Sequence, residues 1–303
     1  MFELIKDTSI IITAAGEGIR WNNEISELKQ LAIIEGKPVI QRTIDQLHNY
    51  GYNNVYVATR SDVLANAISN AQIIEPQKTN SLSDTILSCA EYFSDRTVII
   101  LGDVYLSDSA LQNILDFKGE IQFFGLDRSS IPVIKENRSP EIFALCYTKK
   151  SEKKMRKLLD ENSTFAQIRD YPFRQNRLYL WLRKKKLSEN LKKAYGPIPP
   201  DYFVRKGYKP NPLWKLMRIV FHKPNYAKFY GKLWGLYIRV AEIDAFSGEG
   251  ASWPVTSNNY FIEINDITDD IDDEADFFRL KKRILSIGIL PLFQYSIPVL
   301  TFL

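Results

Sequence analysis

The chain has 303 residues, of which 45% are hydrophobic and 25% charged, and its formal net charge is +4. A chain of this length and apolar content can bury a sizeable core, which suggests one large domain or one domain with a substantial insert. It holds only two cysteines, Cys89 and Cys146, so a disulfide framework is excluded and we expect two buried thiols. Residues 1–10 lack the basic start and apolar run of a secretory signal, which predicts a cytoplasmic protein.

A buried strand followed by a loop of small residues opens the predicted domain. Residues 10–13 are β-branched, as expected for a central, covered strand. Small residues follow at Ala14, Ala15, Gly16 and Gly18, so a large group can approach the backbone there. Glycines at the carboxyl end of such a strand let backbone N–H groups reach a phosphate. The third glycine of a dinucleotide fingerprint is missing, and so is the Gly-Lys-Ser/Thr of a P-loop, so the phosphate site is of another kind.

Strand and helix signals alternate through the first half of the chain. We expect strands at 54–58, 72–74, 97–101, 121–125 and 142–147, and helices after Pro38, at 83–92, after Ser107 and at 151–161. This alternation predicts a mostly parallel sheet with helices on both faces.

Past residue 165 the alternation stops, and a basic, aromatic segment with many prolines begins. Residues 173–240 contain seventeen Lys or Arg against two acidic residues, together with fourteen aromatic residues. We favour a lid over a phosphorylated acceptor or a subunit interface, which would make the protein a homo-oligomer. The segment could instead bind an anionic membrane surface or a nucleic acid, although no nucleic-acid-binding signature is recognised.

Order resumes near residue 260, with a strand at 260–264, an acidic loop and a helix at 275–286. We expect Phe278, Ile284 and Leu285 on the buried side of this helix.

The sequence thus divides into a core at 1–164, a largely helical insert at 165–257 and a return to the core at 258–303. No charge occurs from residue 284 to residue 303, but a glycine and two prolines interrupt this stretch. We therefore favour packed core or interfacial contact over a membrane-spanning helix.

Two permanent cations follow the small-residue loop. Arg20 closes the loop, Lys29 lies nine residues further on, and Gly36-Lys37-Pro38 then begins a helix. Cations beside a backbone anion site suit a polyphosphate. As exposed loop residues, Arg20 and Lys29 are expected to add little to stability.

This part of the chain resembles the nucleotidyltransferases, which transfer a nucleoside monophosphate onto a phosphorylated acceptor. The resemblance lies in the order of its motifs, which are a strand, A-A-G-x-G-x-R, L-K-x-L and G-K-P. These enzymes include sugar-phosphate nucleotidyltransferases, methylerythritol-phosphate and phosphocholine cytidylyltransferases, and molybdenum-cofactor guanylyltransferases. The resemblance covers about residues 8–160 and 258–288. It implies a Rossmann-like three-layer αβα fold with a mostly parallel mixed sheet, of the nucleotide-diphospho-sugar transferase type, to which the insert is added.

Two acidic positions match the magnesium ligands of these enzymes. Asp103 follows the strand at 97–101, and Asp272 lies in IDDEADF, which is similar to the family pattern I-D-x-x-x-D-[LFY]. The resemblance implies that both bind Mg²⁺, while Arg20 and Lys29 act on the triphosphate. Alternatively, Asp103 can cap a helix, and the acidic loop can be a solvated turn in which another aspartate is the ligand.

The loop before the helix at 83–92 contains Asn80, Ser81 and Ser83, which the resemblance assigns to recognition of the base and ribose. Residues 79–83, together with G-D-V-Y at 102–105, resemble the cytidylyltransferases more than the thymidylyl or guanylyl enzymes, so the resemblance favours CTP. The alternative is that Ser81 or Ser83 only caps the helix.

The resemblance implies an Mg²⁺-dependent enzyme that transfers CMP from CTP to a sugar phosphate, an alditol phosphate or a similar small acceptor. Pyrophosphate would be released, and the product would supply surface polysaccharide synthesis. A glycosyltransferase of the related fold is an alternative, but Asp103-Val104-Tyr105 lacks the second Asp of a D-x-D motif. A non-catalytic nucleotide-binding protein is a further possibility, and the presence of Arg20, Lys29 and Asp103 argues against it.

Overall fold

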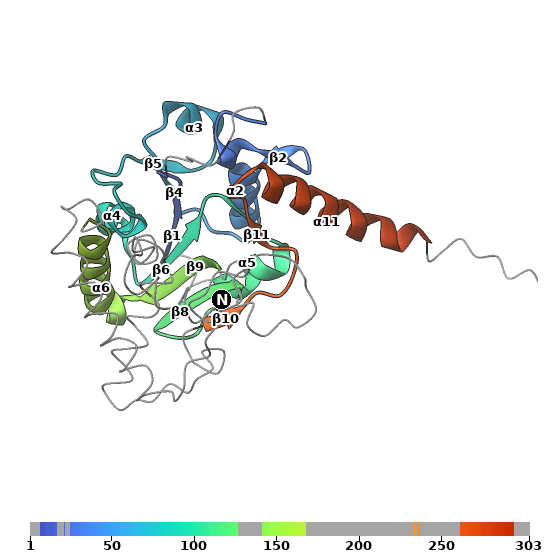
Figure 1. Ribbon diagram of the computed structural model, residues 1–303. Helices are drawn as coiled ribbons and strands as arrows, with labels where there is room; N and C mark the ends of the chain where they lie inside the picture. The colour runs from blue at the N-terminus through green and yellow to red at the C-terminus, as the bar shows by residue number, and fades with distance from the viewer. Residues whose placement is uncertain are drawn as a thin grey trace, which may run out of the picture.

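The computed structural model describes residues 7–16, 21, 25–126, 141–167, 233, 236 and 261–293 (Figure 1). Almost all of the predicted insert lies outside these residues, as do Gly18, Arg20 and the chain after residue 293. The three-part division of the chain and the role of the insert therefore stay predictions.

A seven-stranded sheet forms the centre of the fold, in the order β10-β8-β9-β6-β1-β4-β5. The strands are β1 (Thr8–Thr13), β4 (Val55–Ala58), β5 (Gln72–Ile74), β6 (Arg96–Leu101), β8 (Ile121–Leu126), β9 (Glu141–Thr148) and β10 (Phe261–Glu263). Strand β9 is antiparallel to β6 and β8, and the other neighbouring strands pair in parallel. The expected mostly parallel mixed sheet is confirmed.

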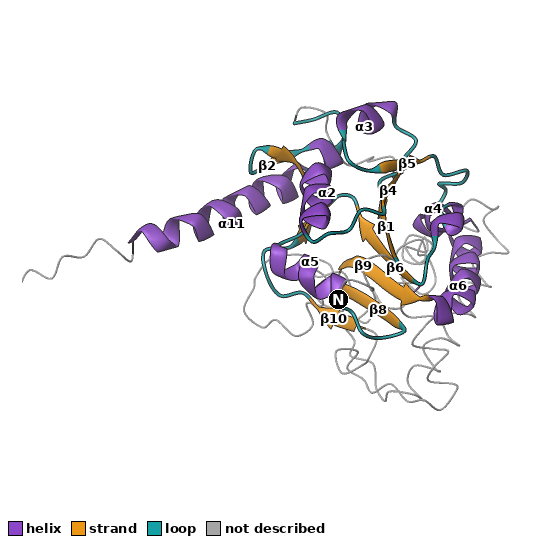
Figure 2. Ribbon diagram, turned by 180° about the vertical axis from the view of Figure 1, so that it is seen from behind, coloured by secondary structure: helices purple, strands orange, loops and turns teal. Residues whose placement is uncertain are grey.

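Helices cover both faces of this sheet, which gives the three layers (Figure 2). They are α2 (Val39–Asn49), α3 (Asp62–Ala67), α4 (Leu82–Ser88), α5 (Asp108–Leu115), α6 (Lys149–Gln167) and α11 (Glu274–Phe293), with short 3₁₀ turns η1 (Lys29–Leu31) and η2 (Ala90–Tyr92). One apolar core joins the sheet to α4 and α6, and a second joins it to α2 and α5. Helix α2 buries Ile40, Ile44 and Leu47, whose spacing of three and four residues places them on one helix face.

Two short antiparallel pairs lie beside the main sheet. Strand β7 (Val104–Tyr105) pairs with β11 (Asp269–Asp270), and β2 (Ile33–Ile34) pairs with β3 (Lys37–Pro38) in a hairpin. The sequence predicted a loop where β11 lies.

The C-terminal helix corrects the expected orientation of its side chains. Phe278 and Leu285 are 60% and 62% exposed, so the expectation that they are buried was wrong. Phe277 and Leu280 are buried instead. Successive residues are rotated by about 100° around a helix, so an error of one position turns an apolar side chain to the solvent.

Cys89 and Cys146 are both free and buried, as expected. Burial raises the pKa of the Cys89 thiol to about 12. Helix α4 ends one residue before Cys89, so the predicted helix at 83–92 is an α-helix followed by the separate turn η2. Across the described part of the chain, none of the helices combines the length and apolar character needed to span a membrane.

Candidate active site

The carboxyl ends of β1 and β6 lie side by side and bring the small-residue loop to Asp103. Ala14, Ala15 and Gly16 follow β1 directly. The Gly102 N–H donates to the Thr13 carbonyl at 2.9 Å. A Cβ at Gly102 would lie 3.0 Å from that oxygen and 3.1 Å from the Ala14 Cβ, so glycine permits the close approach. Asp103 is the next residue after this contact.

Lys29 lies between the two aspartates that the sequence identified. Its ammonium pairs with Asp103 and is 3.6 Å from Asp272 Oδ1. Burial by itself would lower the pKa of Lys29, but the charges of Asp103, Asp272 and Asp270 raise it above its usual value. The Lys29 side chain is only 13% exposed, so the sequence-based description of it as an exposed cation was wrong.

Strand β11 explains how the acidic loop approaches this lysine. Asp270 pairs with Val104 in register, and the Ile271 N–H donates to the Asp103 carbonyl at 2.9 Å. Alternate residues of an extended segment point to the same side. The buried Ile271 points into the protein, and Asp270 and Asp272 point toward the site.

Other aspartates of the same loop have structural partners. Asp266 accepts a hydrogen bond from the Thr268 N–H at 2.7 Å and another from the Ser107 hydroxyl. Asp273 accepts from the Asp276 N–H at 3.0 Å and so caps the start of α11.

Asp269 is buried, and its carboxylate faces two arginines of α11. Its Oδ2 is 3.6 Å from Arg279 and 3.5 Å from Arg283. This pairing ties the acidic loop to α11, and it leaves Asp270 and Asp272 as the aspartates of the loop that face Lys29 or Glu141.

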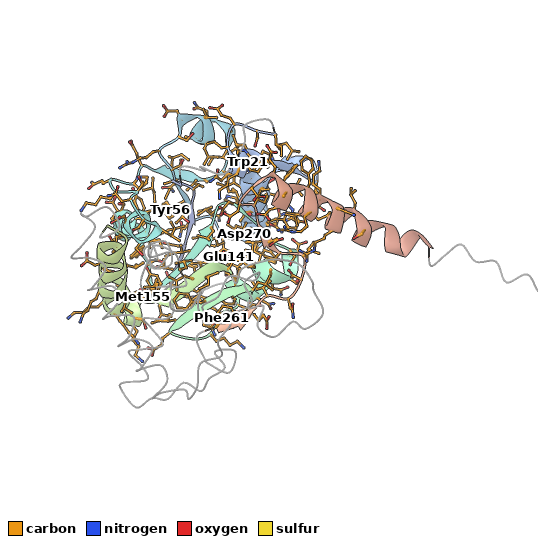
Figure 3. All side chains as sticks on the ribbon, viewed as in Figure 1. Trp21, Tyr56, Glu141, Met155, Phe261 and Asp270 are labelled. Atoms are coloured by element: carbon orange, nitrogen blue, oxygen red, sulfur yellow. The ribbon has the colours of Figure 1, made fainter. Side chains whose placement is uncertain are left out.

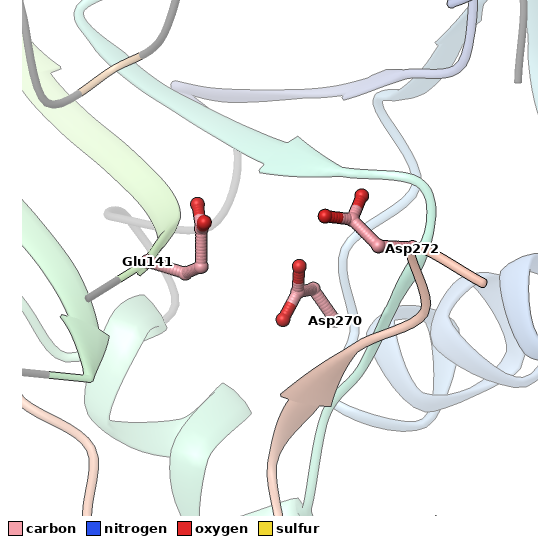
Figure 4. A group of neighbouring side chains, drawn as sticks. All are labelled: Glu141, Asp270 and Asp272. Carbon is pink, nitrogen blue, oxygen red and sulfur yellow. The ribbon is translucent and has the colours of Figure 1, made fainter. Parts of the chain in front are cut away.

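Glu141, the first residue of β9, completes the acidic group. One carboxylate oxygen from each of Glu141, Asp270 and Asp272 lies within 4.8 Å of the others, and the three carboxylates face one another (Figure 4). Figure 3 shows the position of Glu141 and Asp270 in the whole molecule. Burial and then the charges of Glu141, Asp272, Asp269 and Asp103 raise the pKa of Asp270 well above its usual value. A cation brought among these carboxylates would relieve that repulsion.

Sequence reasoning missed Glu141 because no motif surrounds it. Its place depends on the register shift between β8 and β9 at Phe124/Gly125. A Cβ at Gly125 would lie 2.2 Å from the Glu141 carbonyl oxygen, so only glycine allows this approach. A glycine inside an apolar strand is the signal that could have indicated it.

The donor set suits a hard divalent cation. Carboxylate oxygens are the ligands that Mg²⁺ and Ca²⁺ prefer, and Glu141, Asp270 and Asp272 supply them within 4.8 Å of one another. Asp103 is outside this group of three and is connected to it through Lys29, which also lies near Asp272. The chemistry of the described residues therefore fits the divalent metal that the nucleotidyltransferases use.

Hydrogen bonds within the protein hold the loop that the sequence predicts to recognise the base. The Ser81 hydroxyl accepts from the Asp84 N–H at 3.1 Å, so Ser81 is the N-cap of α4. Ser83 is buried, whereas Asn80 is exposed. Arg60 also holds the loop, through the Pro76 carbonyl at 2.8 Å. Contact of Asn80, Ser81 or Ser83 with a nucleotide stays a prediction.

A third apolar cluster connects the segments that carry these residues. It contains Trp21, Ile34, Tyr105, Ile271 and Phe277, with Ala32, Val39 and Leu280. Trp21 follows Arg20 in sequence, and its ring meets the Phe277 ring edge-on with centroids 6.3 Å apart. Trp21, the segment that follows Lys29 and the acidic loop therefore share one small core.

Comparison with known proteins gives one family match and several distant structural similarities. Residues 10–165 match the family described as MobA-like NTP transferase domain. The CTP:phosphocholine cytidylyltransferase of Streptococcus pneumoniae is 12% identical, over 92% of this chain and 99% of its own, with a TM-score of 0.47. HddC of Yersinia pseudotuberculosis is 12% identical, over 91% of this chain and 99% of its own, with a TM-score of 0.43. The bifunctional IspDF of Campylobacter jejuni is 17% identical, over 56% of this chain and 45% of its own, with a TM-score of 0.39.

Proposed function

Because the chain belongs to the MobA-like NTP transferase domain family and is a nucleotidyltransferase, we propose that it transfers CMP from CTP to a phosphorylated small acceptor. A sugar or alditol phosphate is the acceptor class we favour, and pyrophosphate is the second product. The observation that carries the proposal is the meeting of Lys29, Asp103 and Asp272 near Ala14, where the small-residue loop begins.

The proposed reaction needs control of charge more than a nucleophilic side chain. An acceptor phosphate is already ionised, so it can attack the α-phosphorus without a serine, cysteine or histidine. Asp103 and Asp272 would hold Mg²⁺, with Asp270 and Glu141 beside them. When bound, Mg²⁺ supplies electrostatic stabilisation of the charge that develops on phosphate oxygens.

Lys29 and the small-residue loop would act on the triphosphate. Backbone N–H groups at Ala15, Gly16 and Gly18 suit phosphate oxygens, because no large side chain blocks them. The Ala14 N–H already donates to the Ala58 carbonyl at 2.9 Å, so Ala14 would contribute only its small side chain. Lys29 lies beside Asp103, so its ammonium could move onto the β- and γ-phosphates as pyrophosphate leaves. Arg20 would supply a second cation from the same loop.

Preference for CTP would come from Asn80, Ser81, Ser83 and the backbone around them. A site that pairs with the cytosine edge leaves buried polar groups without partners when a purine enters. The exposure of Asn80 supports its side chain as the group that meets the base.

The insert would cover the acceptor or form an interface between subunits. Its charge suits a phosphorylated acceptor, and a variant without the charges of Arg183–Lys186 should then lose affinity for the acceptor and keep its affinity for CTP. Loss of affinity for anionic vesicles or RNA, with acceptor binding intact, would instead indicate a membrane or nucleic-acid role.

Pyrophosphate release tests the proposed function directly. The wild-type protein is incubated with Mg²⁺, each nucleoside triphosphate and a panel of sugar and alditol phosphates. The proposal predicts release that needs both CTP and an acceptor and that is lost in Asp272→Asn. Release with a purine nucleotide alone, at an equal rate in that variant, would contradict it.

A further inference from the structure

Tyr105 contacts both segments that carry the site's aspartates. It lies two residues after Asp103, and its backbone pairs with Asp269 of β11. Its side chain is 2% exposed and packs in the third apolar cluster with Ile34 and Ile271. The ring is therefore fixed relative to the acidic loop.

The Tyr105 hydroxyl reaches across to the segment that carries Lys29. It donates a hydrogen bond of 2.8 Å to Glu35 Oε2, in the turn between β2 and β3. This turn follows Lys29 by six residues and connects to η1 through Ala32, whose carbonyl accepts from the Val39 N–H at 3.1 Å. Burial and the Glu35 carboxylate raise the pKa of Tyr105, so the phenol keeps its proton as a donor.

Glu35 adopts a backbone conformation that is unfavourable for glutamate. Its φ is 51°, and Gly36 follows with a φ of 80°. Two-residue hairpin turns with positive φ favour Asn, Asp or Gly at the first position, and a left-handed residue with a Cβ costs about 1–2 kcal/mol. The contacts of the Glu35 side chain offset this cost.

Arg42 of α2 locks the Glu35 and Tyr105 side chains together. Its Nε donates to Glu35 Oε2 at 3.1 Å, and its guanidinium lies 4.3 Å from the centre of the Tyr105 ring. A second guanidinium nitrogen donates to the Leu106 carbonyl at 2.5 Å and to Gln46 Oε1 at 3.0 Å. With four partners contacted at once, the Arg42 side chain has little freedom to move.

We infer that Tyr105 is a positioning residue that, through Glu35, holds Lys29 in place against Asp103 and Asp272. The two segments are joined twice: at the site by the Lys29 ion pair, and behind it by the Tyr105 hydroxyl. The inference rests on the proposed function only for the role of Lys29 in turnover.

Tyr105→Phe keeps the ring in the core and removes only the hydrogen bond to Glu35. The expected result is about a tenfold lower kcat with KM for CTP changed less than about twofold, because small misplacement of a catalytic group is costly in rate. Tyr50→Phe is the matched control, since its hydroxyl makes an exposed hydrogen bond of 3.4 Å to the Asp108 carbonyl and does not contact Glu35. Equal kinetics in wild type and Tyr105→Phe, when Lys29→Ala itself slows turnover, would overturn the inference.

Glu35→Asn separates positioning from stability. Asparagine suits the positive φ of this turn better than glutamate, but it is too short to reach the Tyr105 hydroxyl. The inference predicts an unchanged or higher thermal midpoint together with the same loss of kcat. A lower midpoint with normal kcat would show a merely structural role and overturn it.

A double-mutant cycle identifies the residue on which Tyr105 acts. If Tyr105 works through Lys29, then Tyr105→Phe should change kcat less than about twofold in a Lys29→Ala background. The full loss in that background would overturn the inference.

Amine labelling gives a readout that does not depend on catalysis. Reductive methylation is followed at Lys29 by mass spectrometry, with the exposed Lys150 as reference. Labelling of Lys29 relative to Lys150 should rise several-fold in Tyr105→Phe and in Glu35→Asn, and unchanged labelling would overturn the inference. If Lys29→Ala leaves turnover normal while this labelling rises, the proposed role of Lys29 fails and the positioning by Tyr105 stands.

Discussion

The ammonium of Lys29 pairs with the carboxylate of Asp103, although the two residues lie on separate segments that follow neighbouring strands. The same ammonium is 3.6 Å from Asp272, so one cation compensates carboxylates from two distant parts of the chain. The same ion pair therefore stabilises the fold and positions a proposed catalytic residue.

Lys29→Ala should both slow turnover and destabilise the metal-free protein. It removes the cation next to the proposed triphosphate and leaves Asp103 and Asp272 uncompensated, at a cost of about 1–3 kcal/mol. Lys37→Ala is the matched control, because Lys37 is exposed and pairs at 2.5 Å with Asp45 only on the protein surface. Steady-state kinetics and thermal unfolding with EDTA check both effects, and a Lys29→Ala protein that matches Lys37→Ala would refute the assignment.

Asp272→Asn and Asp273→Asn should differ sharply, although the residues are adjacent. Loss of the Asp272 charge should lower kcat by about 100-fold or more and abolish stabilisation by Mg²⁺. Asp273 caps α11, and asparagine caps a helix as well as aspartate, so that variant should keep most of its activity. Thermal shift with Mg²⁺ distinguishes them, and the opposite ranking would show that the acidic loop is wrongly assigned.

Asp270→Asn should stabilise the metal-free protein in a pH-dependent way. Burial and neighbouring charges raise the pKa of Asp270 well above 3.8, so the protonated form stabilises the fold. That contribution is complete below the ordinary pKa and is lost as pH rises through the raised one.

Urea unfolding with EDTA measures this effect. The variant should be more stable than wild type at about pH 8, and the difference should shrink toward about pH 5. Adding Mg²⁺ should stabilise wild type more than the variant. If the wild-type protein is as stable as the variant at the higher pH, then burial and the neighbouring carboxylates do not destabilise the ionised form of Asp270.

Glu141→Gln should weaken the response to divalent cations. It keeps the size of the side chain but removes one of three converging charges, so the Mg²⁺ concentration for half-maximal thermal shift should rise several-fold. Glu120→Gln is a suitable control, because Glu120 is exposed and pairs with Lys150. An unchanged Mg²⁺ response in Glu141→Gln would remove Glu141 from the site.

The central sheet was predictable from the sequence because its signals are local. Residues 10–13 belong to the buried strand β1. Ser107 caps α5, because its hydroxyl accepts a hydrogen bond from the Ala110 N–H at 3.0 Å. Such patterns report burial and capping within a few residues. They do not report the orientation of α11, where Phe277 and Phe278 are adjacent and equally apolar.

The acidic part of the site was only partly predictable. Asp103 and Asp272 were identified by resemblance, whereas β11 looked like a solvated turn because its two residues are aspartates. Its pairing with β7 depends on a contact between residues far apart in the chain. Glu141 depends on strand register in the same way, and register is set by tertiary packing.

Calorimetric titration of the protein with CTP, UTP, ATP and GTP in the presence of Mg²⁺ tests the central claim most directly. The account predicts that CTP binds at least several-fold more tightly than ATP or GTP, and that Asp272→Asn and Lys29→Ala both weaken this binding. It also predicts normal CTP binding in Asp273→Asn and Lys37→Ala. Equal affinity for all four nucleotides would contradict the proposed base preference, and CTP binding that survives both Asp272→Asn and Lys29→Ala would contradict the proposed site.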